Sequence, residues 1–138
     1  MHDARNLTGP ATVLVVEDDP EMRALLKAFL QREGYRVIEE ARGDLARLLV
    51  ESERLDVVIV DKEIPGLNGL ELLSLLRHRR PEVPVILITA FGGPAVAEEA
   101  LRRGARYYVE KPFRVTKIVE TVEGLIKGPD ERSQRGHV

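Results

Sequence analysis

Short runs of aliphatic, mostly β-branched residues alternate with amphipathic stretches about five times along this chain of 138 residues. Such runs are typical of buried strands, and they lie near residues 12–17, 35–40, 56–61, 84–89 and 107–110. Apolar residues spaced three and four apart indicate helices, and these stretches lie near residues 20–33, 44–53, 69–79, 94–103 and 114–127. Strict alternation of strands and helices implies a parallel sheet with right-handed crossovers and helices on both faces. The pattern therefore predicts one doubly wound α/β domain.

Length and composition narrow the class of protein further. We expect one domain over residues 12–127, a flexible N-terminus at 1–11, and a disordered tail or linker stub at 128–138. The formal net charge of -2 gives no support for nucleic-acid binding, and the lack of cysteine excludes disulfides and thiolate metal sites. No apolar stretch approaches the roughly 18 residues of a membrane span. Because the N-terminus also lacks a signal-peptide core, a cytoplasmic location is expected.

Three acidic side chains stand at the ends of two predicted strands. Asp61 ends one apolar run, and Asp18 and Asp19 stand at the end of the run that starts at residue 12. Open α/β sheets bind ligands at the carboxyl ends of their strands, so the three carboxylates meet if the two strands are neighbours. Close carboxylates repel each other, and a bound cation, a lysine or a shared proton relieves that repulsion. Lys111, just after a third such run, is the candidate lysine.

These acids belong to a longer ordered pattern of residues at strand ends. An acidic pair follows the first strand, an aspartate with proline and glycine at offsets of four and eight follows the third, a threonine ends the fourth and a Lys-Pro pair ends the fifth. In chain order the pattern consists of Asp18, Asp19, Asp61, Pro65, Gly69, Thr89, Lys111 and Pro112. Over residues 12–127 the chain thus resembles the receiver domains of two-component response regulators. The resemblance implies a flavodoxin-like five-stranded parallel sheet of order 2-1-3-4-5 with five helices.

The resemblance also implies a metal-dependent phosphoacceptor site. Asp61 is the implied acceptor of the phosphoryl group. Mg²⁺, or Mn²⁺ in its place, would be bound directly by Asp19 and Asp61, through water by Asp18, and by the backbone carbonyl of Glu63. Oxygen ligands of this kind suit Mg²⁺, which usually binds through a few carboxylates and keeps several waters. Lys111 would contact a phosphoryl oxygen.

Two further residues take their implied roles from the same family. Thr89 would donate its hydroxyl to the phosphoryl group and act as a switch together with Tyr108, which resembles the family's aromatic switch residue. Pro112 is the candidate for a cis proline. The implied function is a phosphorylation-controlled switch that catalyses only its own phosphorylation and slow dephosphorylation and is not a metabolic enzyme. A histidine kinase or a histidine phosphotransfer protein would be the donor, and a downstream target or a second copy would bind the face formed by residues 94–127.

Several of these residues also allow a plainer interpretation. Asp19 stands before Pro20 and suits the N-cap of a helix. Tyr108 could simply pack in the core, and Glu63 could be a loop glutamate that faces solvent. The ring of Phe91, two residues after Thr89, could restrict the water that hydrolyses a phosphoaspartate, or it could merely cover a loop.

Other functions remain open from the sequence. The chain could be the receiver part of a longer regulator, such as a DNA-binding transcription factor, because the polar segment after residue 127 resembles a linker. A flavin or nucleotide binder of the same fold would need a glycine-rich phosphate loop after the first strand, where this chain carries acids. A haloacid-dehalogenase-like phosphatase would typically place a second aspartate two residues after Asp61, where Glu63 stands.

Overall fold

A computed structural model gives the structure of the protein, and it describes residues 9–128 and Gly136–His137. The strands are β1 (Thr12–Val16), β2 (Arg36–Glu40), β3 (Val57–Asp61), β4 (Val85–Thr89), β5 (Tyr107–Glu110) and β6 (Gly136–His137). The helices are α2 (Pro20–Arg32), α3 (Gly43–Ser52), α4 (Gly69–Arg79), α5 (Pro94–Arg102) and α6 (Val115–Ile126). Apart from β6, each element lies within one residue or so of its predicted range.

All strand pairs of the sheet are parallel, and the spatial order is β2-β1-β3-β4-β5-β6. This order confirms the predicted 2-1-3-4-5 sheet and the flavodoxin-like class, with one short strand added at the edge. In the central pair, Val16 of β1 lies opposite Val60 of β3. The residues that follow these two valines therefore emerge side by side at the carboxyl edge of the sheet.

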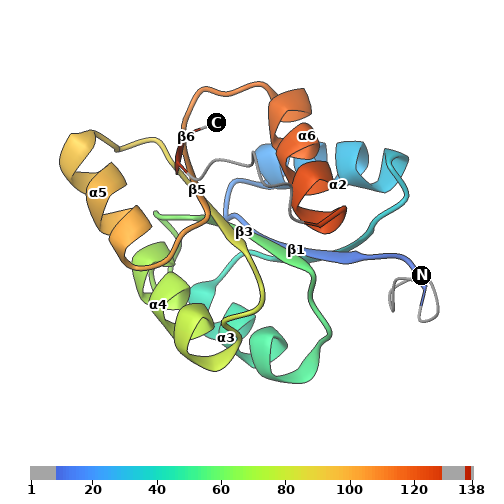
Figure 1. Ribbon diagram of the computed structural model, residues 1–138, viewed down its shortest axis with the longest axis horizontal. Helices are drawn as coiled ribbons and strands as arrows, with labels where there is room; N and C mark the ends of the chain where they lie inside the picture. The colour runs from blue at the N-terminus through green and yellow to red at the C-terminus, as the bar shows by residue number, and fades with distance from the viewer. Residues whose placement is uncertain (1–8, 129–135, 138) are drawn as a thin grey trace.

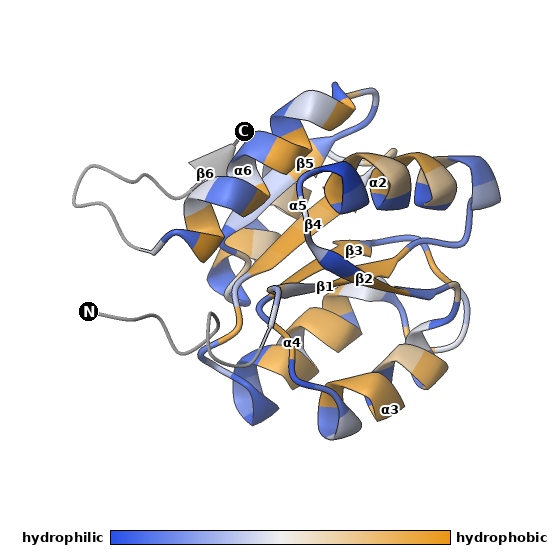
Figure 2. Cartoon of the chain, turned by 90° about the vertical axis from the view of Figure 1, so that its right-hand side faces the viewer, coloured by the Kyte–Doolittle hydropathy of each residue, from blue (hydrophilic) through white to orange (hydrophobic). Residues whose placement is uncertain are grey.

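Helices cover both faces of the sheet (Figure 1). On one face α2 and α6 pack on alternate strand residues such as Val13, Ile59 and Ile88. On the other face α3, α4 and α5 pack on the intervening residues, among them Leu14 and Val58. The central strands β3 and β4 are buried along their length and largely hydrophobic (Figure 2), whereas the edge strand β2 is partly exposed and carries charged residues. Strands buried on both faces are the expected result of parallel packing between two helical layers.

Local chemistry sets where two of the helices begin. Asp19 caps α2, because its side chain accepts a hydrogen bond from the backbone of Glu21, and Pro20 takes the first helical position. Asn68 and Glu71 form a capping box at the start of α4. These two helices begin directly beyond β1 and beyond the loop after β3, so their caps also hold the loops that carry the acidic residues.

The described residues include the whole predicted domain and parts of both predicted terminal segments. Residues 1–8, 129–135 and 138 lie outside the described residues, so the predicted flexibility of the ends stays a prediction there. Gly136–His137 pair with β5 as a parallel strand, which the expectation of a disordered tail did not foresee. Within the described part of the chain, no helix has both the length and the apolar character that a membrane span requires.

Candidate functional site

Asp61 lies at the carboxyl end of β3, where its side chain is almost completely buried at 2% exposure. One carboxylate oxygen, Oδ1, accepts a hydrogen bond of 2.8 Å from the backbone amide of Glu63. The other, Oδ2, accepts a hydrogen bond of 2.6 Å from Nζ of Lys111. Burial raises the pKa of Asp61 to about 7, although its bonds with Lys111 and the Glu63 amide act in the opposite direction.

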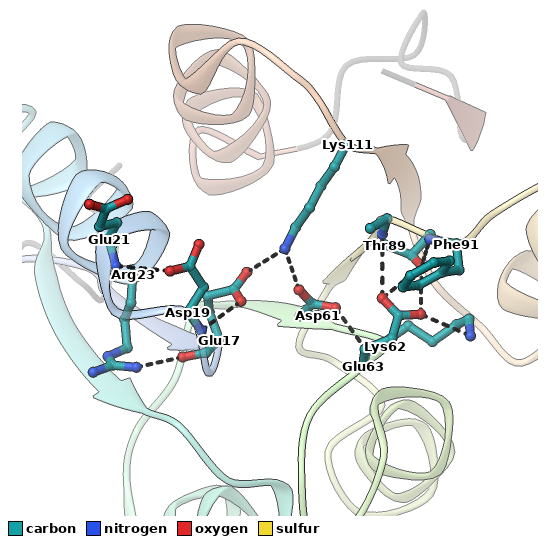
Figure 3. A network of polar contacts seen from close by, with 11 residues as sticks. Glu17, Asp19, Glu21, Arg23, Asp61, Lys62, Glu63, Thr89, Phe91 and Lys111 are labelled. Carbon is teal, nitrogen blue, oxygen red and sulfur yellow. Dashed lines mark hydrogen bonds and ion pairs between the residues drawn. The ribbon is translucent and has the colours of Figure 1, made fainter.

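Lys111 follows β5 and reaches back across the edge of the sheet toward the acids (Figure 3). Its ammonium group lies between two carboxylates, 2.6 Å from Asp61 Oδ2 and 3.1 Å from Glu17 Oε1. Burial disfavours the charged form of this lysine, but its hydrogen bonds to Asp61 and Glu17 outweigh burial and raise the pKa of Lys111. The predicted lysine therefore stands beside the predicted phosphoacceptor and also holds a buried acid that the sequence analysis did not select.

Glu17, Asp18 and Asp61 form the carboxylate cluster at this edge, with one oxygen from each lying within 4.8 Å of the others. Glu17 and Asp61 are buried, whereas Asp18 is exposed and opens the cluster to solvent. Three carboxylates without sulfur or imidazole are the donor set that Mg²⁺ and Mn²⁺ prefer. The residues present thus fit a hard divalent cation.

The structure brings together a different set of acids from the one predicted. Asp19 was expected to be a direct ligand, but its carboxylate caps α2 through the Glu21 amide and does not join the other three. Glu17 lies beside Asp61 in the position that was predicted for Asp19, and Asp18 completes the cluster. The sequence pattern that could have identified Glu17 is an acid directly after an apolar run, since Glu17 follows Val16 as Asp61 follows Val60. The structure shows that these two valines lie opposite each other in neighbouring strands.

Thr89 ends β4, the neighbour of β3, and it is fully buried. Its hydroxyl donates to the carboxylate of Glu63, at 2.8 Å from Oε2 and 3.0 Å from Oε1. The same carboxylate accepts a bond of 3.3 Å from the amide of Ala90 and pairs with Lys62 at 2.9 Å. Burial acts to raise the pKa of Glu63, but the bonds from Lys62 and Thr89 outweigh it and lower that pKa. Glu63 is therefore partly exposed but bound to the end of β4, and it does not face solvent freely as the plainer interpretation expected.

The segment after Thr89 connects the site with β5. Tyr108 is fully buried and donates its hydroxyl to Glu110 Oε2 at 2.8 Å, while the amide of Gly93 donates to the Tyr108 hydroxyl at 3.2 Å. Burial, helped by Glu110, raises the pKa of Tyr108. The aromatic residue named as a switch thus already lies inside the fold, bonded to the loop that leads into α5.

Three other predicted residues have defined positions at this edge. The Lys111–Pro112 peptide bond is cis, which is the arrangement that the resemblance implied. Gly69 lies against the backbone of Asp61 and Lys62, where a Cβ atom would collide with main-chain atoms. The ring of Phe91 is 70% exposed, so it projects into solvent near the mouth of the site and does not cover a loop tightly.

Comparison with known proteins agrees with this geometry. The sequence pattern of the response regulator receiver domain matches residues 13–123. The nitrogen assimilation regulatory protein NtrX of Azorhizobium caulinodans is 36% identical over 119 residues, which are 83% of this chain and 26% of that protein. The sporulation initiation phosphotransferase F of Bacillus subtilis is 33% identical over 111 residues, which are 80% of this chain and 90% of that protein. The chain therefore spans about a quarter of the first relative and nearly the whole of the second.

A solved structure provides a third comparison. A response regulator protein from Burkholderia pseudomallei, whose crystal structure contains a phosphorylated aspartic acid, a calcium ion and citrate, superposes with a TM-score of 0.75 at 28% identity. The match covers 81% of this chain and 66% of that one. A protein of similar sequence and fold has thus been observed with phosphate on an aspartate and with a divalent cation.

Proposed function

The chain belongs to the response regulator receiver domain family of two-component signalling, and from its geometry we propose that Asp61 is the side chain that accepts the phosphoryl group. The observation that carries the proposal is the position of Lys111, whose ammonium group bridges Asp61 and Glu17 at the tips of neighbouring strands. A nucleophilic carboxylate needs a nearby positive charge to offset the charge of an incoming phosphoryl group. Lys111 supplies that charge directly at Oδ2 of the proposed nucleophile.

The proposed reaction is a direct transfer from a phosphohistidine of a donor protein. An oxygen of Asp61 forms a bond to phosphorus, the P–N bond breaks, and its electron pair stays on the imidazole nitrogen of the donor. The product is an acyl phosphate on Asp61, and later attack by water returns the free carboxylate and inorganic phosphate. The protein would in this way catalyse its own phosphorylation and dephosphorylation without turning over a metabolite.

A divalent cation completes the proposed site. Glu17, Asp18 and Asp61 would hold Mg²⁺ with their carboxylates, and the backbone carbonyl of Glu63 would join them as the family resemblance implies. When bound, Mg²⁺ would neutralise charge on the phosphoryl oxygens during transfer. Thr89 would donate its hydroxyl to one of those oxygens after the transfer, and Lys111 would contact another.

An intact-mass measurement tests the assignment of Asp61. The protein is incubated with acetyl phosphate and Mg²⁺, and we expect one phosphoryl adduct on the wild-type chain. Asp61→Asn keeps the shape of the side chain but removes the nucleophilic oxygen, so this variant should stay unmodified. An adduct of the same yield on Asp61→Asn would contradict the proposal.

The partners follow from the same chemistry. We propose a histidine kinase or a histidine phosphotransfer protein as the donor, and a target or a second copy bound to the face of residues 94–127 as the output. Two relatives favour different arrangements of the whole protein. The matched region makes up 90% of sporulation initiation phosphotransferase F, as in a free receiver, but only 26% of NtrX, as in the receiver part of a longer regulator. The length of the native gene distinguishes a free receiver from the receiver part of a longer regulator.

A further inference from the structure

The hydroxyl of Thr89 is committed to a partner other than Asp61. A hydroxyl group carries one proton, and Thr89 donates that proton to the carboxylate of Glu63, with the two oxygens at 2.8 and 3.0 Å. The Thr89 oxygen also accepts a bond of 2.9 Å from the amide of Phe91. Because Thr89 is fully buried, its hydroxyl cannot leave Glu63 for bulk water and needs another acceptor first.

Glu63 is fixed beside the phosphoacceptor by its own backbone. Its amide donates to Asp61 Oδ1 at 2.8 Å, so the main chain of this residue lies against the proposed nucleophile. From there its side chain turns toward the end of β4 and meets both Thr89 and the amide of Ala90 (Figure 3). The Glu63 carboxylate thus takes up the Thr89 hydroxyl and the Ala90 amide, two donors at the strand end next to Asp61 that the oxygens of a phosphoryl group on Asp61 would need.

We propose that the carboxylate of Glu63 is a built-in substitute for the phosphoryl group, which holds Thr89 in its resting position until Asp61 is phosphorylated. This inference rests on the proposed role of Asp61. The Thr89 hydroxyl and the Ala90 amide cannot serve a phosphoryl oxygen while they donate to Glu63. Phosphorylation must therefore break these bonds, and Glu63 sets a threshold for both the transfer and the movement of Thr89.

Charge explains how the phosphoryl group displaces this carboxylate. A phosphoryl group carries about two negative charges and stands where the ionised carboxylate of Asp61 carried one, and like charges in a partly buried site repel strongly. Glu63 has a second partner in Lys62, whose ammonium group lies 2.9 Å from Oε2. Both side chains are partly exposed, at 32% for Glu63 and 23% for Lys62. The released carboxylate can thus turn toward solvent while it remains paired with Lys62.

We call the hydrogen bond between Thr89 and the Glu63 carboxylate the latch. Substitution of Glu63 tests the latch through the rate of phosphorylation. The rate constant with acetyl phosphate is measured at saturating Mg²⁺ for wild type, Glu63→Gln and Glu63→Ala. In Glu63→Ala no carboxylate has to be displaced from Thr89 before the phosphoryl group arrives. The rate constant should therefore rise by roughly tenfold, which corresponds to the loss of one hydrogen bond to a charged group. Glu63→Gln keeps an acceptor without the charge and should fall between the two. Glu82→Gln, on the exposed loop before β4 and at the opposite end of the sheet, is the control and should match wild type.

A second measurement separates a latch from a merely structural glutamate. Without any phosphoryl donor, the NMR signals of the Thr89 methyl group and the Ala90 amide in Glu63→Ala should move toward their positions in wild type saturated with beryllofluoride and Mg²⁺. Unchanged rates together with unshifted signals, in a variant that still forms the Asp61 adduct, would overturn the latch alone. Absence of the adduct in wild type as well would reject the role of Asp61, and the latch with it.

Discussion

Two adjacent aspartates after β1 make different contacts, although their side chains are chemically identical. Asp18 contributes an oxygen to the cluster with Glu17 and Asp61, whereas Asp19 accepts from the Glu21 amide and caps α2. One residue of chain is enough to make this difference, because the backbone leaves an extended strand and enters a helix at this point. The identity of each side chain therefore says less about its role than its position relative to Val16, the last residue of β1.

A comparison of alanine substitutions tests this division between the two aspartates. Asp18→Ala should weaken Mg²⁺ binding by about tenfold or more, because an oxygen ligand is lost. Asp19→Ala should leave Mg²⁺ affinity within about twofold of wild type, and it should lower the free energy of unfolding by about 1 kcal/mol through loss of the helix cap. Titration calorimetry with Mg²⁺ and urea unfolding measure the two effects. A larger loss of Mg²⁺ affinity in Asp19→Ala would restore the assignment first expected from the sequence.

At the scale of the elements, the loop between β3 and α4 depends on the lack of a side chain at Gly69. A Cβ atom there would collide with the main chain of Asp61 and Lys62, and backbone atoms cannot move aside as a flexible side chain can. The amide of Gly69 also donates to the carbonyl of Lys62 at 3.0 Å. The start of α4 thus lies directly against the segment that carries Asp61, the proposed phosphoacceptor.

Two glycine substitutions, in α4 and α6, test this dependence. Gly69→Ala should destabilise the protein by about 1–3 kcal/mol, because the added methyl group forces the backbone apart, and it should slow phosphorylation of Asp61 by displacing its loop. Gly124→Ala is the matched control, since a Cβ atom at Gly124 meets no atom within 4 Å. In the interior of a helix this change should stabilise the protein by about 0.5–1 kcal/mol. Thermal unfolding and the acetyl phosphate reaction give the answer, and equal stability of the two variants would contradict the argument.

The sequence predicted the elements well because their signals are local. Apolar runs flanked by glycine and proline set the strands, and β3 and β4 were placed to within a residue. The site was harder, because it depends on which way side chains turn at a strand end. Glu17 was missed although it follows β1 as Asp61 completes β3, and the contact between Glu63 and Thr89 joins residues that are 26 positions apart. Hydrophobic periodicity reveals helices and strands, but a single contact between two polar side chains leaves no repeating pattern in the sequence.

Across the whole molecule, two sets of hydrogen bonds, joined by the backbone of residues 91–93, lead from the site toward α5. The amide of Phe91 donates to Thr89, and the amide of Gly93 donates to Glu110 Oε2 at 2.9 Å and to the hydroxyl of Tyr108. Gly93 is followed by Pro94, the first residue of α5. Only Ala97 and Ala100 of that helix are buried, and both side chains are small, so the helix is lightly anchored. Movement of Thr89 would therefore disturb the loop at 90–93 and, through it, a helix that can shift.

Hydrogen exchange with and without beryllofluoride and Mg²⁺ tests this route through the molecule. We expect the amides of residues 90–110 to change their exchange rates together with those near Asp61, because the bonds of Thr89 to its loop must rearrange. The amides of residues 33–36, in the turn between α2 and β2 at the opposite edge of the sheet, serve as the internal control and should not change. Thr89→Ala should leave Asp61 able to accept phosphate while removing the response at 90–110. Changes confined to residues 17–19 and 61–69 in the wild type would show that the signal leaves the site by another path, and loss of phosphorylation in Thr89→Ala would show that this residue acts in the transfer itself.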